Sequence, residues 1–361
     1  MTSTGLEPQR RARGSLAAAT VAVIAGGRSS EREISLASGS AILAALRARP
    51  ASGEIEGPGR ILSVSIEGDG SWNVEGERCD PPSAIAGLPR DTLYFLGLHG
   101  GEGENGAVQG FLETASRAYT GSGVGASALC MDKRATRLVA ADCGVPVAPG
   151  FRVDRVEWEG NAEAVLGRAA ALSAGGWAVK PNAGGSSVAT TMVEHTEDLR
   201  AAIELALATG DSAIVEARIR GAEATCAVLG NAEGECRSLP PVEIVPRAGR
   251  YFDWEQKYSP TGADEHCPPR TLPARAIRRL GELAERVHRA AGCDGYSRSD
   301  FIVPADGGDP VFLETNTLPG MTDRSLLPKS ARAAGMSFRA LCLEIVALAI
   351  ERFARGPGSA R

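Results

Sequence analysis

The spacing of apolar and polar positions along the chain predicts strands followed by helices. An alanine- and leucine-rich stretch ending near Arg47 follows the glycine pair Gly26-Gly27, and Ser30 and Glu33 have the spacing of a capping box for that helix. A strand, a glycine turn and a helix make a βα unit, so we expect a small parallel sheet with helices on its faces. Three apolar runs have the length of buried strands in such a sheet: 21–25, 61–66 and 92–98.

The stretches between these runs have a different composition. Residues 50–60 and 67–90 are rich in glycine, proline and charged side chains. Connecting segments of this kind run over protein surfaces. We therefore expect surface insertions there, without catalytic groups.

The second half of the chain predicts further α/β units. A helix over 132–143 ends at Gly144, and a strand over 177–180 leads through a glycine-rich loop into a returning strand over 188–193. Apolar positions at three- and four-residue spacing within 273–291 indicate an amphipathic helix that packs on a sheet. Two other segments complete this expectation: a helix over 162–174 and a long polar loop over 247–269.

The N-terminus supports two interpretations. Arg10, Arg11 and Arg13 precede an apolar stretch from Leu16, which is the order of residues in a secretory or twin-arginine signal. The same stretch ends in a β-branched run that leads into the glycine turn, which is typical of a first buried parallel strand. We favour the strand, and we expect residues 1–19 to be a disordered extension.

Composition narrows the class of protein. The chain has 361 residues, enough for two or three domains, and 39 basic against 44 acidic side chains give a net charge of −5, so no nucleic-acid partner is expected. No apolar run approaches the roughly 20 residues of a membrane span, so we expect a cytoplasmic protein without a membrane partner. The eight cysteines form no C-x-x-C pair and are expected to be mostly buried thiols of a reducing compartment. Four histidines far apart in sequence argue against a histidine-rich metal centre, and only His99 is reserved for function.

The segment from Lys180 to Val188 combines one cation with two glycines and the hydroxyls of Ser186 and Ser187 at a turn between strands. Backbone amides beside glycine, serine hydroxyls and an ammonium group can together cradle phosphate oxygens. The segment does not match the G-x-x-x-x-G-K-[ST] pattern, and it joins a strand to a strand. Taken alone, a flexible hairpin tip explains it as well as a phosphate loop does.

A second cluster of polar residues lies on two predicted strands near the C-terminus. Alternation places Arg298 and Asp300 on one face of a strand, and Glu314 and Asn316 on one face of a neighbour if the two strands pair. Two carboxylates and an amide oxygen are hard ligands that suit Mg²⁺ held together with substrate phosphates. A salt-bridged sheet surface would explain the arginine and the aspartate, but hardly an asparagine followed by a proline-glycine turn. The cluster therefore favours a metal site.

In order and combination, these motifs resemble the D-alanine–D-alanine ligases of the ATP-grasp superfamily. The glycine- and serine-rich hairpin, the R-x-D strand and the E-x-N-T-x-P-G-M-T segment from Glu314 carry the resemblance. It covers most of residues 20–340 and is thin over 1–19, 48–90 and 151–176. Further segments are similar to the family's signature: Gly26-Gly27, Glu31–Leu36, Leu98–Gly100, Gly103–Gly106, Tyr119–Gly123, Met131–Lys133, Asp253–Tyr258 and Ser325-Leu326.

The resemblance implies a mixed α/β (α+β) chain with the ATP-grasp fold and an N-terminal Rossmann-like parallel-sheet domain. We assign the Rossmann-like substrate domain to 20–121, the central ATP-grasp subdomain with the glycine and serine loop to 122–216, and the C-terminal ATP-grasp subdomain with a lid loop and the Mg²⁺ site to 217–361. Three positions depart from the usual pattern and affect loop docking rather than the reaction class: Asn105, Ala189 and Ser299.

The resemblance also implies an activity. ATP would phosphorylate the carboxylate of one D-alanine, and the amine of a second would attack the acyl phosphate to give D-alanyl-D-alanine for peptidoglycan synthesis. A free carboxylate is a poor electrophile, and phosphoryl transfer supplies the leaving group that positioning alone cannot. The implied cofactors are ATP and two Mg²⁺ or Mn²⁺ ions, the implied partners are D-alanine and a second copy of the chain in a homodimer, and no side-chain nucleophile is needed.

Carried over residue by residue, the matching motifs imply an ATP site and a metal site. Glu216 would meet the amino edge of adenine and Glu223 the ribose hydroxyls. Lys257, on the long polar loop, would reach the γ-phosphate when that loop closes and excludes water. The metal ions would neutralise charge on the transferred phosphate. The implied phosphate-binding residues are Lys133, Lys180, Ser186 and Ser187, and the implied metal ligands are Asp300, Glu314 and Asn316.

The motifs likewise imply subsites for two amino acids. Glu31, at the start of a helix, would pair with the ammonium of the first D-alanine, although an acidic residue there also suits the helix dipole. His99 would help to bind the first carboxylate and Ser325 the second. The other implied residues serve catalysis: Arg298 and the Gly320 N–H as donors to the tetrahedral oxyanion, and Ser186 with Tyr258 in aligning the first subsite and its loop.

Three alternatives to the ligation of two D-alanines stay open. The same fold could take D-serine or D-lactate as its second substrate, although the resemblance implies that lactate-using relatives lack the tyrosine found here at Tyr258. A non-catalytic ATP-binding module would keep Lys133 and Lys180 but would not need Arg298, Gly320 and Asn316 together. A nicotinamide dehydrogenase would carry G-x-G-x-x-G after the first strand, and the chain lacks that spacing.

Overall fold

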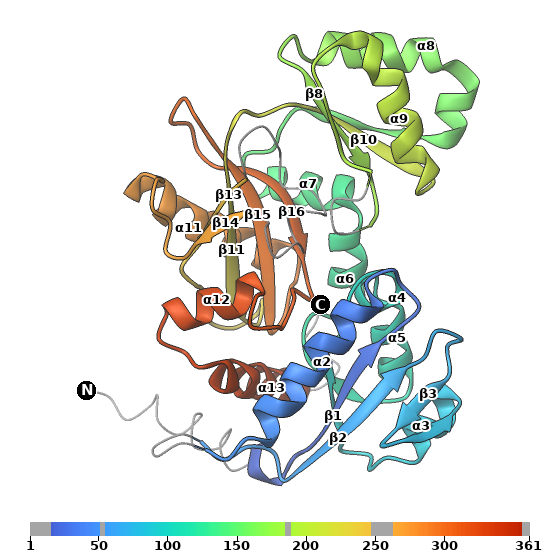
Figure 1. Ribbon diagram of the computed structural model, residues 1–361, viewed down its shortest axis with the longest axis vertical. Coiled ribbons are helices and arrows are strands. Elements are labelled where there is room, and N and C mark those ends of the chain that lie inside the picture. Colours follow the sequence, from blue (N-terminus) through green and yellow to red (C-terminus); the bar gives the residue numbers. More distant parts are fainter. Residues whose placement is uncertain (1–15, 51–54, 185–188, 247–262, 356–361) are drawn as a thin grey trace.

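The computed structural model describes residues 16–50, 55–184, 189–246 and 263–355, whose strands form three sheets (Figure 1). The first sheet has the order β4-β3-β2-β1-β5-β6, and its central strands run parallel. The three apolar runs of the sequence are strands of this sheet, as predicted. Its parallel strands are β1 (Thr20–Gly26), β2 (Arg60–Ile66), β5 (Leu93–Leu96) and β6 (Ala118–Tyr119).

The helix predicted after the first strand is α2 (Arg32–Arg47), which packs on β1. The predicted capping box does not form, because Glu31 occupies the N-cap position and no side chain caps the helix. Backbone bonds close the turn instead, from the Arg32 N–H to the Ser29 carbonyl (3.2 Å) and from the Ser35 N–H to the Glu31 carbonyl (3.0 Å). Glu31 therefore lies at the N-terminus of α2, near the end of the first sheet.

The segment 67–90 is more than the surface insertion that its composition predicts. Trp72 and Ile85 are buried in the core of the first sheet, and Asp80 caps a short helix. The strands there have three residues each, too few for alternation to be recognised in the sequence. Three elements make up the segment: β3 (Trp72–Val74), β4 (Glu77–Cys79) and α3 (Pro81–Ala86).

The second sheet is antiparallel and four-stranded, with the order β7-β10-β8-β9. The strand predicted over 177–180 is β8, and the returning strand is β9, so the glycine-rich segment joins two neighbouring strands as predicted. The helix predicted over 162–174 is longer, because α8 starts at Arg155 and is kinked at Asn161. The elements are β7 (Gly150–Asp154), α8 (Arg155–Leu172), β8 (Trp177–Pro181), β9 (Thr191–Val193), α9 (Leu199–Ala208) and β10 (Ser212–Ala217).

The third sheet has the order β14-β13-β11-β15-β16, with β12 paired to β11. The amphipathic helix predicted over 273–291 is α11 (Ala274–Ala290), which packs on β11 and β15. The strands are β11 (Gly221–Gly230), β12 (Cys236–Ser238), β13 (Val242–Val245), β14 (Asp264–His266), β15 (Tyr296–Pro304) and β16 (Val311–Asn316). The other helices are α4 (Gly101–Glu104), α5 (Ala107–Thr114), α6 (Val124–Met131), α7 (Lys133–Asp142), α12 (Leu326–Ala333) and α13 (Phe338–Ala354).

The hydrophobic cores do not follow the sheets one to one. The largest core joins the first sheet to α12 and α13, and α13 packs directly against α2 (Figure 1). The second sheet has a core of its own with α8 and α9. A third core lies between α11 and the sheet of β11 and β15. The first and third sheets thus form one packed body, and the second sheet stands apart at one end.

Within the described residues, no single helix has both the length and the apolar character of a membrane span. One pair of helices, α12 and α13, meets those criteria only when the two are taken together, and they meet at a bend of 103°. The eight cysteines are free thiols, four of them buried and four partly buried.

His288 near the end of α11 is buried, and burial lowers its pKa to about 4. Its Nε2 donates to the Gly230 carbonyl (3.1 Å), so its Nδ1 accepts from the Ser297 hydroxyl (2.7 Å) and the ring is neutral. The unfolded chain binds this proton with a pKa near 6.5, so acidification between about pH 6.5 and 4 favours the unfolded state.

We expect the free energy of unfolding in urea to fall through this window by up to roughly 3 kcal/mol on account of His288. His288→Gln should lack this part of the pH dependence, whereas a variant of the exposed His195, His195→Gln, should keep it. Equal pH slopes for wild type and His288→Gln would contradict the assignment.

Candidate functional site

A cavity of about 340 Å³ opens between the second and third sheets. It is bounded by β8, β9 and β10 on one side and by β11, β15 and β16 on the other, with the start of α7 between them. Its apolar walls include Met192, Ile219, Ile302 and Leu313. It also gathers six residues that the sequence assigns to ATP or metal binding: Lys133, Lys180, Glu216, Glu223, Asp300 and Glu314.

The start of α7 positions the first of these cations. Asp132 caps the helix, and the Lys133 N–H donates to the Asn182 carbonyl (3.0 Å), so the helix begins against the glycine loop. The Lys133 ammonium donates to the Gly184 carbonyl (2.5 Å) and lies 3.2 Å from a carboxylate oxygen of Glu314. A cation held between the loop and β16 is suited to bind phosphate oxygens that enter between them.

Glu216 near the end of β10 is the centre of a buried charge cluster. Its side chain is 3% exposed, Lys180 Nζ lies 3.2 Å from its Oε2, and the Arg137 guanidinium pairs with its Oε1. Arg137 is 2% exposed and also donates to the Ala148 carbonyl. Burial lowers the pKa of Arg137, and the neighbouring carboxylate opposes that change by favouring the charged form.

Arg137 is a site residue that the sequence reasoning missed. A signal was present, because Lys133 and Arg137 stand four residues apart on α7 and so lie on one face of that helix. The same face of α7 thus places Lys133 at the cavity and Arg137 beside Glu216.

Arg137→Met is expected to lower the free energy of unfolding by roughly 3 kcal/mol, because it removes one partner of a buried ion pair and leaves the other buried. Denaturation in urea measures the loss. Arg134→Met, on the same helix but only half-buried, is the matched control and should change stability by less than about 0.5 kcal/mol. Equal losses in the two variants would contradict a special role for the buried pair.

Strands β15 and β16 pair as the alternation predicts. Arg298 lies opposite Asn316, and Asp300 lies opposite Glu314, in antiparallel register. Arg298 donates two bonds of 2.9 Å to Asp300, from Nε to Oδ1 and from Nη2 to Oδ2. The register shifts just after Asp300, so Leu313 is the extra residue of a bulge, a feature that re-aims side chains beside active sites.

These residues can contribute to a divalent metal site without completing one. In the part of the chain that the structure describes, no three His, Cys, Asp or Glu side chains gather as metal ligands. Asp300 accepts twice from Arg298 and once from Thr225, which leaves about one of the four lone-pair positions of a carboxylate. With Glu314 and the amide of Asn316 it offers three hard oxygen ligands. This donor set fits Mg²⁺, which completes its coordination with water and phosphate oxygens.

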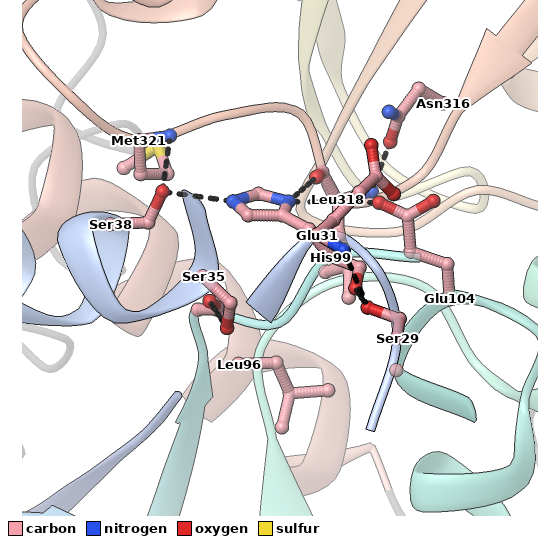
Figure 2. Close-up of polar contacts among 12 residues, drawn as sticks. Ser29, Glu31, Ser35, Ser38, Leu96, His99, Glu104, Asn316, Leu318 and Met321 are labelled. Atoms are coloured by element: carbon pink, nitrogen blue, oxygen red, sulfur yellow. Dashed lines mark hydrogen bonds and ion pairs between the residues drawn. The ribbon is translucent and has the colours of Figure 1, made fainter. Parts of the chain in front are cut away.

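A second group of predicted residues lies beside the turn after β16 (Figure 2). Glu31 is buried at the start of α2, with one carboxylate oxygen against the backbone of Gly100. The His99 ring is buried as well, with Nδ1 3.0 Å from the Leu318 carbonyl and 3.6 Å from a carboxylate oxygen of Glu104. Residues from the first sheet and from the loop after the third sheet therefore meet at this point.

Gly320 and Ser325 belong to the same turn. The Ser325 hydroxyl accepts a hydrogen bond from the Thr322 N–H (3.1 Å). A Cβ atom at Gly320 would lie 2.6 Å from that hydroxyl, so a side chain at this position would displace Ser325. The position of Ser325 therefore requires glycine at 320.

Four predicted site residues fall outside the described residues, and their roles stay predictions: Ser186, Ser187, Lys257 and Tyr258. The other predicted residues lie in two groups, one around the cavity and one around the turn after β16. Asp300, Glu314 and Asn316, on the paired strands β15 and β16, lie next to both groups.

Comparisons with known proteins agree with this geometry. The family model described as the C-terminus of D-ala D-ala ligase matches residues 139–347. A D-alanine–D-alanine ligase from Halalkalibacterium halodurans is 39% identical over 92% of this chain and 99% of its own length. The corresponding ligase from Desulforudis audaxviator is 43% identical over the same shares of the two chains.

Solved structures extend the similarity to the fold. The D-alanine-D-alanine ligase from Coxiella burnetii superposes with a TM-score of 0.77 at 27% identity, over 94% of this chain and 96% of that one. The VanG D-Ala:D-Ser ligase from Enterococcus faecalis superposes with a TM-score of 0.78 at 30% identity, over 92% and 99%. The expected α/β ATP-grasp fold is confirmed. The chain belongs to the D-alanine–D-alanine ligase family.

Proposed function

We propose that this chain joins two D-alanines to D-alanyl-D-alanine while ATP is converted to ADP and phosphate. One observation carries the proposal: a single cavity gathers four of the seven residues implied for ATP together with two of the three implied for metal. A module that only binds a nucleotide would not need the proposed metal ligands beside the ATP-binding residues. The product would serve as a building block of the cell-wall peptidoglycan.

The first half-reaction is the phosphorylation of a carboxylate. Lys133 and Lys180 would hold the phosphates of ATP, and Glu216 and Glu223 its adenosine, so that the γ-phosphate faces the end of β16. Asp300, Glu314 and Asn316 would hold Mg²⁺, which neutralises charge on the transferred phosphate. Lys133 and Lys180 are already paired with carboxylates of the site, so these cations are oriented before the nucleotide binds.

In the second half-reaction, the amine of the second D-alanine attacks the acyl phosphate, and the C–N bond forms as phosphate leaves. Negative charge develops on the carbonyl oxygen of the tetrahedral intermediate. Arg298 and the Gly320 N–H are the proposed donors to that oxygen. Two bonds to Asp300 orient the planar guanidinium, and the turn after β16 presents the Gly320 backbone.

The amino acid subsites are proposed at the turn after β16. Glu31 would pair with the ammonium of the first D-alanine, and Ser325 would bind the carboxylate of the second. His99 borders the first subsite, but both of its ring nitrogens already contact protein groups. A cytoplasmic location, which free thiols fit, and a homodimer complete the proposal.

Phosphate release from Mg-ATP tests the proposal, with D-alanine alone, L-alanine alone, and D-alanine paired with D-serine or D-lactate. Mass spectrometry identifies the products. Dipeptide from D-alanine alone supports the proposal, and tight ATP binding without any turnover would contradict it.

The D-serine alternative is kept because one structural relative is a D-Ala:D-Ser ligase at 30% identity. Turnover that requires D-serine beside D-alanine would keep the acyl phosphate chemistry and change the second subsite. The dipeptide formed in direct competition between the two amines decides between these substrates.

A further inference from the structure

The turn that presents Gly320 is held on both sides by one pair of side chains from the N-terminal part of the chain. Before the glycine, the Leu318 carbonyl lies 3.0 Å from His99 Nδ1. After it, the Met321 N–H donates to the Ser38 hydroxyl (3.3 Å). Ser38 Oγ and His99 Nε2 are 2.8 Å apart, so the two side chains close a ring of hydrogen bonds around the glycine (Figure 2).

With a neutral His99 ring, only one arrangement of protons satisfies all three contacts. The Leu318 carbonyl can only accept, so Nδ1 of His99 carries a hydrogen. The Met321 N–H can only donate, so the Ser38 oxygen accepts there and its own O–H points to Nε2 of His99. Both ring nitrogens of His99 are then used in contacts with the protein. Ser38 is 0% exposed and His99 6%, so water has little access to these bonds.

The same turn is tied to the proposed metal site. The Asn316 side-chain oxygen accepts from the Leu318 N–H (2.8 Å), so the residue held by His99 is also held by a proposed metal ligand. Ser38 lies on α2, whose N-cap residue is Glu31. One helix therefore connects the proposed ammonium-binding carboxylate to the position of the Gly320 peptide.

We propose that Ser38 is a positioning residue for ligation and acts, through His99 and the Met321 N–H, to fix the direction of the Gly320 N–H toward the reacting carbonyl. The inference rests on the proposed function, which makes that N–H an oxyanion donor. An oxyanion donor is effective only when it is oriented before charge develops. His99 is assigned the same role, since neither of its ring nitrogens is left to bind a substrate carboxylate.

The loss of the Ser38 hydroxyl should slow the chemical step without weakening nucleotide binding. Ser38→Ala leaves the Met321 N–H and His99 Nε2 without their partner, so the turn becomes free to shift. A displacement of about 1 Å near reacting groups can cost on the order of 100-fold in rate. We expect dipeptide formation in a single turnover to slow by roughly 10- to 100-fold, with the KM for ATP changed by less than about twofold.

Ser35 supplies a matched control three residues earlier on α2. It is also 0% exposed, and its hydroxyl accepts from the Gly26 N–H (2.8 Å) and donates to the Gly97 carbonyl (2.7 Å), away from the turn. Ser35→Ala removes an equally buried hydroxyl, so its thermal stability should fall by a similar amount. Its single-turnover rate should stay within about threefold of wild type.

Two further variants keep the test decisive if Ser38→Ala folds poorly. Ser38→Cys retains the size of the side chain and a weak donor, and its rate should lie between those of wild type and Ser38→Ala. His99→Asn combined with Ser38→Ala should be no slower than the slower single variant, because both act through one network.

The outcomes separate the two proposals. Equal single-turnover rates for Ser38→Ala and Ser35→Ala, with dipeptide still formed by wild type, would overturn the role of Ser38 and leave the ligase activity in place. An increase in the KM for ATP in parallel with the loss of rate would also overturn it. Absence of dipeptide from the wild-type enzyme would overturn the proposed function and this inference with it.

Discussion

Arg298→Ala is expected to lower kcat by about 100- to 1,000-fold while the Kd for ATP changes by less than about threefold. The guanidinium is held at the end of β15 by two bonds of 2.9 Å to Asp300, so it is oriented before substrate arrives. Its proposed partner is the charge of the tetrahedral intermediate, which does not exist in the ground state. A lost interaction of that kind appears in kcat and not in nucleotide affinity.

Two variants control this result. Arg298→Lys keeps the positive charge but cannot form the fork to Asp300, so its kcat should lie between those of wild type and Arg298→Ala. Arg275→Ala removes an arginine on α11 that pairs with Asp309 away from the proposed subsites, and its kcat should be unchanged. Isothermal titration with an ATP analogue measures the affinity. Unchanged turnover in Arg298→Ala, or a parallel loss of ATP affinity, would contradict the proposed role.

Glu314→Gln is expected to raise the Mg²⁺ concentration for half-maximal activity at least tenfold and to lower kcat by roughly 100-fold. The change keeps the size of the side chain and removes one of the two carboxylates that lie opposite each other on β15 and β16. It also removes the ionic partner of Lys133. Fewer charged ligands weaken the binding of a hard cation that carries nucleotide phosphates.

Binding of Mn²⁺ in the presence of ATP, followed by electron paramagnetic resonance, provides a readout that does not depend on turnover. Glu265→Gln is the matched control, because Glu265 lies on β14 of the same sheet and pairs with Lys329. It should leave both Mn²⁺ affinity and kcat within about twofold of wild type. Equal Mn²⁺ affinity in Glu314→Gln and wild type would contradict the assignment of Glu314 as a metal ligand.

The parts of the site that the sequence predicted well depend on local periodicity. Arg298 and Asp300 are two residues apart on one strand, so alternation alone puts them on one face, and the same holds for Glu314 and Asn316. The pairing of β8 with β9 was likewise predicted, from the turn residues between the two runs. Such patterns depend only on residues that are close together in the sequence.

The parts that were missed depend on contacts between distant segments. Ser38 meets Met321 only because α2 packs beside the turn after β16, and no local pattern encodes that approach. Arg137 pairs with Glu216 across two elements, although its spacing from Lys133 was a usable hint. The capping box at Ser30 failed because backbone bonds already close that turn.

The division of the hydrophobic cores determines which parts of the molecule unfold together. The first sheet shares its core with α12 and α13, so these ends of the chain must open together as one cooperative unit. The second sheet has its own core and can open separately. Because the cavity lies between the second and third sheets, a bound nucleotide would contact two units with separate cores. Its binding free energy would therefore stabilise the arrangement in which the two units are held together.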